Sequence, residues 1–100
     1  VKVQPERIEE MASKWLYQQG IEAQVAALGL PDAQLGERVA LAIEGAPLSA
    51  ESLAQLMDFL KNHLPPYFPP KNIGFLTQFP LTATGKTDKM RIKATWPEMD

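Results

Sequence analysis

The chain has 100 residues, of which 45% are hydrophobic and 22% are charged, values typical of one soluble globular domain. Its net charge of −2 argues against nucleic acid as the main partner, and the absence of cysteine excludes a disulfide framework and a thiolate zinc site. No apolar run approaches the roughly 20 residues that span a bilayer, so we expect no membrane segment. The absence of cysteine fits a reducing compartment, and we expect a cytoplasmic location.

Residues 5–19 are predicted to form an amphipathic helix. One apolar stripe at helical spacing comprises Ile8, Met11, Ala12, Trp15 and Leu16. Pro5 suits the first turn, where its missing N–H costs nothing, and Gly20 is placed to end the helix. We interpret Trp15 as a core residue rather than a ligand-stacking one. Before this helix, Val1–Val3 resembles the interior of a strand, and a chain that begins with Val1 is expected to be part of a longer protein.

Two strands are predicted next, over residues 21–30 and 38–44, and they are expected to pair with each other. A second helix should follow Ser49, a favourable N-cap, and end before Pro65. His63 is the only histidine and lies in the last turn of that helix, where a cation is favoured, so we predict no metal site.

The last third of the chain begins with a proline-rich segment, residues 65–72, which we interpret as a structural bridge; an SH3-type ligand is the alternative. A third strand over residues 73–79 and a short helix over residues 89–95, capped by Asp88, complete the chain. This order predicts an α+β fold, a small sheet of about three strands packed with helices.

The loop between these last two elements carries the sequence PLTATGKTDK, residues 80–89. Its Gly-Lys-Thr also ends the nucleotide-binding P-loop, G-x-x-x-x-G-K-[ST]. However, Pro80 stands at the first glycine and has no N–H for a phosphate, and only 14 residues follow Lys86, too few for the strand that brings an aspartate to Mg²⁺. We therefore do not predict a P-loop.

A second interpretation of this loop is an exposed turn that presents Lys86. Gly85 permits positive φ and close approach of another molecule, while Thr82, Thr84 and Thr87 are suited to brace the turn by side-chain hydrogen bonds. A lysine on such a turn can reach into the cleft of another domain and stabilise charge on a phosphate or carboxylate. A plain surface lysine is the alternative.

The segment LPPYFPPKNIGFLTQFPLTATGKTDK, residues 64–89, resembles the C-terminal signature of the adenylate-forming enzymes: acyl- and aryl-CoA ligases, peptide-synthetase adenylation domains and luciferases. The signature runs L-P-x-Y, a proline, an apolar strand, then P-x-T-x-x-G-K. The matching residues are Leu64, Pro65, Tyr67, Pro70, Ile73, Phe75, Pro80, Thr82, Gly85 and Lys86. Residues 3–10 and 31–44 resemble further segments of the same small domain, so the resemblance covers essentially the whole chain.

The resemblance implies that residues 1–100 are the mobile C-terminal (lid) domain of such a ligase, inactive alone, whose partner is its own large N-terminal domain. It implies a reaction in which a carboxylic acid and ATP give acyl-AMP and coenzyme A then takes the acyl group as a thioester. ATP, coenzyme A and Mg²⁺ would be bound mainly by the N-terminal domain. Lys86 is the implied catalytic residue of the first step, with Gly85 and Lys86 as the implied cofactor-binding residues, and Val1–Val3 would lie near the face used in the second step.

Within the family, residues 1–10 most resemble the o-succinylbenzoate–CoA ligases of menaquinone biosynthesis. Lys89 replaces a common arginine, and Arg7 stands where a glutamate is common. Lys89, Arg91 and Lys93 either meet coenzyme A phosphates or the large domain, or are solvated, which we favour. A non-catalytic interaction module of the same fold and the lid of another acid–thiol ligase remain alternatives.

Overall fold

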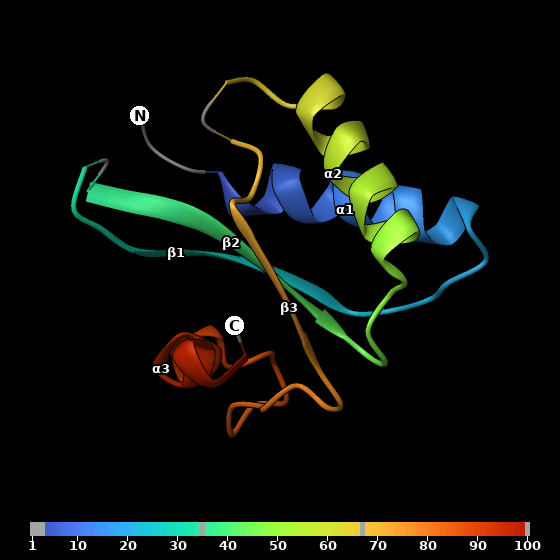
Figure 1. Cartoon of the computed structure of the whole chain (residues 1–100). Coiled ribbons are helices and arrows are strands. Elements are labelled where there is room, and N and C mark those ends of the chain that lie inside the picture. The colour runs from blue at the N-terminus through green and yellow to red at the C-terminus, as the bar shows by residue number, and fades with distance from the viewer. Residues whose placement is uncertain (1–3, 35, 67, 100) are drawn as a thin grey trace.

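The computed structural model describes residues 4–34, 36–66 and 68–99, and within these ranges the chain forms three helices and three strands. In chain order they are α1 (Pro5–Gln18), β1 (Val25–Asp32), β2 (Gly36–Glu44), α2 (Ala50–His63), β3 (Asn72–Leu76) and α3 (Lys89–Met99) (Figure 1). The predicted α+β fold class is confirmed. Val1–Val3 and Tyr67, which the sequence analysis assigned to a strand and to the signature, lie outside the described residues.

The sheet has the order β1-β2-β3 and is mixed. The predicted pairing of the first two strands is confirmed: β1 runs antiparallel to β2, with Leu28 opposite Ala40. The strand β3 runs parallel to β2, with Ile73 opposite Leu41, so α2 serves as the crossover that a parallel pair requires. Both β1 and β3 are therefore edge strands.

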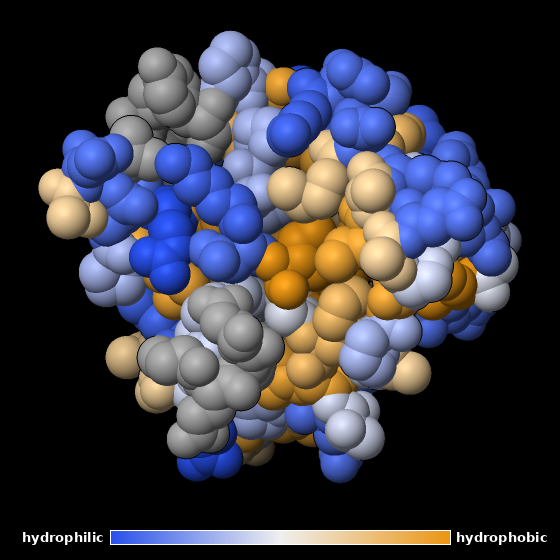
Figure 2. Space-filling view, viewed as in Figure 1, coloured by the Kyte–Doolittle hydropathy of each residue, from blue (hydrophilic) through white to orange (hydrophobic). Residues whose placement is uncertain are grey.

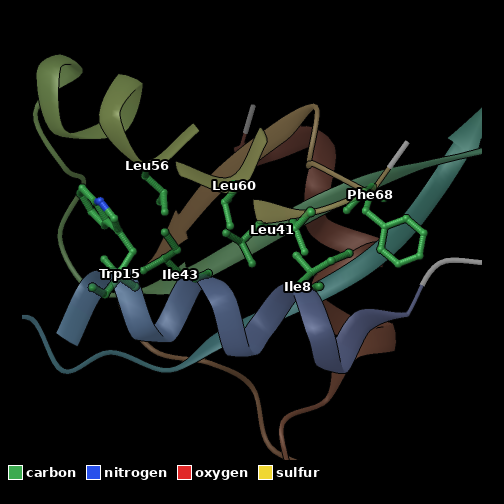
Figure 3. Close-up of a cluster of buried hydrophobic side chains, with 12 residues drawn as sticks. Ile8, Trp15, Leu41, Ile43, Leu56, Leu60 and Phe68 are labelled. Atoms are coloured by element: carbon green, nitrogen blue, oxygen red, sulfur yellow. The ribbon is translucent and has the colours of Figure 1, made fainter. Parts of the chain in front are cut away.

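Side chains of β2 alternate between two cores, one on each face of the sheet. On one face α1 and α2 pack against Leu41 and Ile43. Figure 3 shows Ile8 and Trp15 on the side of α1 that faces this core. On the opposite face α3 packs against Ala40 and Ala42. The first core consists of Ile8, Ala12, Trp15, Leu16, Ala27, Val39, Leu41, Ile43, Leu56, Leu60, Leu64 and Phe68. The second consists of Ala26, Leu28, Leu30, Ala40, Ala42, Phe79, Ile92 and Trp96.

Several local predictions are confirmed by these contacts. Trp15 is a core residue, and Ser49 caps α2 by accepting a hydrogen bond from the Ser52 N–H at 3.1 Å. In the proline-rich segment, Phe68 and Pro70 are buried, and the Lys71 N–H donates to the Val39 carbonyl at 2.9 Å. Because Phe68 and Pro70 are buried, this segment is a structural bridge rather than an exposed SH3-type ligand.

Several element boundaries differ from the predictions by one to four residues, and the contacts of the structure explain the three largest differences. The first strand begins at Val25 instead of residue 21, because the chain turns at Gly20, whose φ is +79°, and Ile21 N–H bonds back to Leu16. The third strand ends at Leu76 instead of residue 79, because the Phe79 N–H leaves the ladder for the Glu44 carboxylate. The last helix continues to Met99, where burial of Trp96 outweighs weak helix propensity.

The face of the molecule seen in Figure 2 is hydrophilic around its margins. Apolar side chains gather in the middle of that view, where β3 crosses the front of the molecule between α2 and α3. Among the described helices, none has the length and apolar character needed to cross a membrane.

Candidate functional site

The Gly-Lys sequence lies on a tight turn between β3 and α3, which we term the lysine loop (residues 80–88). Leu81 and Thr87 form an antiparallel bridge, and the Asp88 N–H donates to the Pro80 carbonyl at 2.8 Å. At the tip, the Thr82 N–H donates to the Lys86 carbonyl at 2.7 Å. These contacts close the loop into a small hairpin. Residues 82–86 are all exposed, so the tip of the hairpin lies on the surface of the domain.

Gly85 gives the tip of this loop its shape. Its φ is +87°, in the region that favours glycine, and its N–H donates to the Thr82 carbonyl at 2.9 Å. A Cβ placed on Gly85 would meet no other atom within 4 Å. The positive φ predicted for Gly85 is confirmed, and the glycine is required by backbone conformation rather than by crowding inside the domain.

Threonine side chains brace the turn, as predicted for Thr82 and Thr84. The Thr82 Oγ1 accepts a hydrogen bond from the Lys86 N–H at 3.2 Å, and it lies 3.1 Å from the Thr84 Oγ1. Thr87 contributes through its backbone bridge to Leu81. Local side-chain hydrogen bonds of this kind fix a turn without a core beneath it.

Lys86 therefore has a fixed backbone and a free side chain. Its N–H and its carbonyl are both bonded to Thr82, whereas its ammonium forms no ion pair with a carboxylate of the described residues. A P-loop would direct successive backbone N–H groups at a phosphate, but here the Gly85 and Lys86 N–H groups are used inside the turn. What the loop offers outward is the Lys86 cation.

Both ends of the lysine loop are held by carboxylates that the sequence analysis missed. Before the loop, the Phe79 N–H donates to the Glu44 Oε2 at 2.7 Å. After it, the Lys89 Nζ lies 2.6 Å from the Glu9 Oε2, and the same oxygen accepts the Ala27 N–H at 2.8 Å. Neither glutamate lies near its partner in sequence, so no local pattern indicated these contacts.

The interpretation of Lys89 as a solvated cation is wrong, because it pairs with Glu9. Arg91 and Lys93 are exposed, as expected for solvated side chains.

The cap predicted for Asp88 is confirmed, since its Oδ1 accepts the Arg91 N–H at 3.1 Å and fixes the start of α3.

The remaining candidate residue, His63, lies at the end of α2. Its Nδ1 is 2.8 Å from the Phe59 carbonyl oxygen, and the two rings stack with centroids 4.1 Å apart. Across residues 4–34, 36–66 and 68–99, no group of three or more His, Cys, Asp or Glu side chains is placed to hold a metal ion.

Two shallow hollows run along α1, but neither is lined by a residue of the lysine loop. One lies beside Tyr17 and Glu22, the other beside Arg7 and Glu10. The part of the chain that the structure describes thus presents Lys86 on an open surface. A cation exposed in this way is suited to complete an anion-binding site on another domain.

Comparison with known proteins identifies relatives of this fold. The profile of the AMP-binding enzyme C-terminal domain matches residues 16–86. YngI of Bacillus subtilis (strain 168), provisionally named an acyl-CoA synthetase, is 30% identical over 97 residues, which are 97% of this chain and 17% of that protein. A 2-hydroxy-7-methoxy-5-methyl-1-naphthoate–CoA ligase of Streptomyces carzinostaticus is 36% identical over 72 residues, 71% of this chain and 13% of the ligase.

A solved structure agrees with these sequence matches. The crystal structure of an acyl-CoA synthetase (AMP-forming)/AMP-acid ligase II-like protein from Dyadobacter fermentans superposes with a TM-score of 0.80 and 27% sequence identity. The superposition covers 100% of this chain and 27% of that one. The chain thus spans only 13% to 27% of the length of these three relatives.

Proposed function

The chain belongs to the family of AMP-binding enzyme C-terminal domains, found in acyl-CoA synthetases and other AMP-forming ligases, and from this premise we propose that the intact protein is an ATP-dependent acid–CoA ligase. In this proposal residues 1–100 are its mobile C-terminal domain, and a larger N-terminal domain supplies the acyl pocket and most ATP contacts. The observation that carries the proposal is the exposed Lys86 ammonium on a braced turn, without a carboxylate partner among the described residues.

The proposed role of Lys86 follows from the charges in the first half-reaction. A carboxylate oxygen attacks the α-phosphorus of ATP, and pyrophosphate leaves to give acyl-AMP. Two anions must approach each other, and a preorganised cation between them lowers the barrier. The open surface at Gly85 lets the loop approach the nucleotide closely.

The second half-reaction needs a different arrangement. The thiol of coenzyme A attacks the acyl carbonyl, and AMP leaves as the thioester forms. Lys86 bridges no reacting groups in this step, and the domain rotates to withdraw it; ATP and coenzyme A each select one domain arrangement by differential contacts. Mg²⁺ would neutralise charge on the phosphates. We place its ligands on the N-terminal domain, because the described residues include no group of three or more His, Cys, Asp or Glu side chains that could hold a metal ion.

For the substrate we propose an aromatic carboxylic acid, with o-succinylbenzoate of menaquinone biosynthesis as the first candidate. Two observations support this choice. Residues 1–10 resemble ligases for that acid, and the chain is 36% identical over 72 residues to a naphthoate–CoA ligase.

The proposal is tested by Lys86→Ala in the intact protein. Acyl-AMP formation, followed as carboxylate-dependent exchange of labelled pyrophosphate into ATP, should fall roughly 100- to 1000-fold, as when one preorganised donor is lost. Thioester formation from supplied acyl-AMP should continue at the rate of the unmodified protein.

Lys61→Ala is the matched control, because Lys61 is an exposed lysine of α2 away from the loop, and it should leave both half-reactions intact. If both half-reactions survive Lys86→Ala, the catalytic role is wrong. The domain would then be a non-catalytic interaction module.

A further inference from the structure

We propose that Glu9 is a positioning residue for Lys86, acting through its ion pair with Lys89. By this contact Glu9 holds the start of α3, and with it the lysine loop, against α1 and the edge of the sheet. The inference rests on the proposed function and extends it to a residue distant from Lys86 in sequence.

The Glu9 carboxylate joins three elements. Glu9 lies on α1, its Oε2 accepts the Ala27 N–H of β1 at 2.8 Å, and the same oxygen lies 2.6 Å from the Lys89 Nζ at the first residue of α3. Because β1 is an edge strand, an N–H that donates away from β2, as the Ala27 N–H does to Glu9, has no neighbouring strand to bond and needs another partner.

This ion pair differs from an ordinary surface pair. The Glu9 side chain is 23% exposed and the Lys89 side chain 40% exposed, so the pair is partly shielded from solvent. The hydrogen bond from Ala27 also fixes the carboxylate in advance, which reduces the entropy lost when Lys89 binds it. Glu9 therefore presents a fixed anion to the start of α3.

The contact reaches Lys86 through a short, closed piece of backbone. Lys89 follows the lysine loop directly, and the Asp88 side chain ties the same turn to the Arg91 N–H. Within the loop, the Asp88 N–H bonds to the Pro80 carbonyl, so the two ends of the loop move together. Fixing Lys89 thus fixes the direction in which the loop projects.

The other end of the loop has its own attachment, the hydrogen bond from the Phe79 N–H to Glu44. With both attachments present, the loop is held at two separate points. Without the Glu9 pair, we expect it to pivot about the Phe79–Glu44 contact. A catalytic cation held less closely in place loses part of its effect, since small displacements strongly reduce rate.

Loss of the Glu9–Lys89 pair should affect the position of the lysine loop without unfolding the domain. The helix α3 is packed by Ile92 and Trp96, which are 0% and 1% exposed, and these contacts do not involve Glu9. The domain should therefore remain folded when the charge is removed, while the position of the loop changes.

The experiment uses Glu9→Gln in the intact protein, because glutamine keeps an oxygen for the Ala27 N–H and removes only the charge. We expect kcat for acyl-AMP formation to fall roughly five- to tenfold, with an unchanged KM for ATP. Thioester formation from supplied acyl-AMP and the melting temperature should not change. Glu10→Gln is the matched control, since Glu10 is an exposed neighbour on the same helix, and it should behave as the unmodified protein.

Variants of Lys89 test whether Glu9 acts through its ion pair with this residue. Lys89→Met should reproduce the effect of Glu9→Gln, whereas Lys89→Arg, which keeps the charge, should retain activity. The double variant of Glu9→Gln and Lys89→Met should be no slower than either single variant, as expected for two residues that act through one contact. Additive losses would contradict the pairing.

Two results would overturn this inference alone, provided that Lys86→Ala still slows acyl-AMP formation as predicted. One is a normal rate of acyl-AMP formation in Glu9→Gln. The other is a parallel loss of both half-reactions with a lowered melting temperature, which would make Glu9 a general structural residue. If instead Lys86→Ala keeps acyl-AMP formation, the proposed function fails, and the positioning role of Glu9 fails with it.

Discussion

At the scale of single residues, the lysine loop combines a rigid backbone with the Lys86 side chain, which forms no ion pair with any residue that the structure describes. Thr82 accepts and donates hydrogen bonds on both sides of Lys86, so the position of the Lys86 Cα is set by the loop itself. The side chain remains exposed, and its long stem gives it reach. Gly85 makes this possible, because few other residues adopt its backbone conformation without strain.

Two glycines with positive φ are expected to respond differently to substitution by alanine. Gly85 and Gly20 have φ of +87° and +79°, and an added Cβ would meet no atom within 4 Å at either site. Each substitution by alanine should therefore reduce the free energy of unfolding by about 1–2 kcal/mol, measured by urea denaturation. Only Gly85→Ala should also slow acyl-AMP formation in the intact protein, because strain there displaces Lys86.

Gly20→Ala, at the end of α1, is the control for strain without displacement of the loop. Equal activity of the two variants would show that the loop conformation does not matter for the reaction.

At the scale of elements, α3 joins the sheet to the lysine loop. It covers one face of the sheet, and Ile92 and Trp96 are its buried contacts in the second core. Its first residue, Lys89, makes the ion pair with Glu9. The same short helix thus closes a core and orients the loop that precedes it.

The packing of α3 predicts that substitutions at Ile92 and Met90, within one turn of the helix, differ strongly in their effect on stability. Ile92 is 0% exposed, so Ile92→Ala should lower the free energy of unfolding by about 2–5 kcal/mol through lost burial and a cavity. Met90 is 83% exposed, so Met90→Ala should stay within about 0.5 kcal/mol of the unmodified protein. Denaturant titration of both variants measures the difference, and similar stabilities would contradict the packing of α3 on the sheet.

Most elements were predictable because their signals are local. The stripe of α1, the Ser49 cap and the prolines that follow α2 each depend on neighbours in sequence. The C-terminal ends of the third strand and of the last helix could not be predicted in this way, because they depend on contacts with residues far away in the sequence. Phe79 leaves the ladder for Glu44, and Trp96 is held by the sheet.

At the scale of the whole molecule, the described residues present the Lys86 cation on an exposed turn. The hollows along α1 do not include the lysine loop, and the comparisons place this domain in proteins several times its length. In the ligase that we propose, a larger N-terminal domain would complete the site.

This arrangement predicts how ATP affects stability. Millimolar ATP should not raise the melting temperature of residues 1–100 alone, whereas it should raise that of the intact protein. A ligand at 100 times its Kd stabilises the folded state by about 2.7 kcal/mol, which is readily seen in a thermal melt. A clear rise for the isolated chain would instead favour a nucleotide site within these residues.

The sequence by itself determined the α+β class, most element positions and the exposed turn at Gly85 and Lys86, and it indicated the family. These features follow from local periodicity, capping and turn chemistry, which act over a few residues. Only the tertiary structure decided how the loop is held. The contacts of Glu9 with Lys89 and Ala27, and of Glu44 with Phe79, join residues far apart in the chain. Such pairs are determined by how helices pack on the sheet, and so no short stretch of sequence contains them.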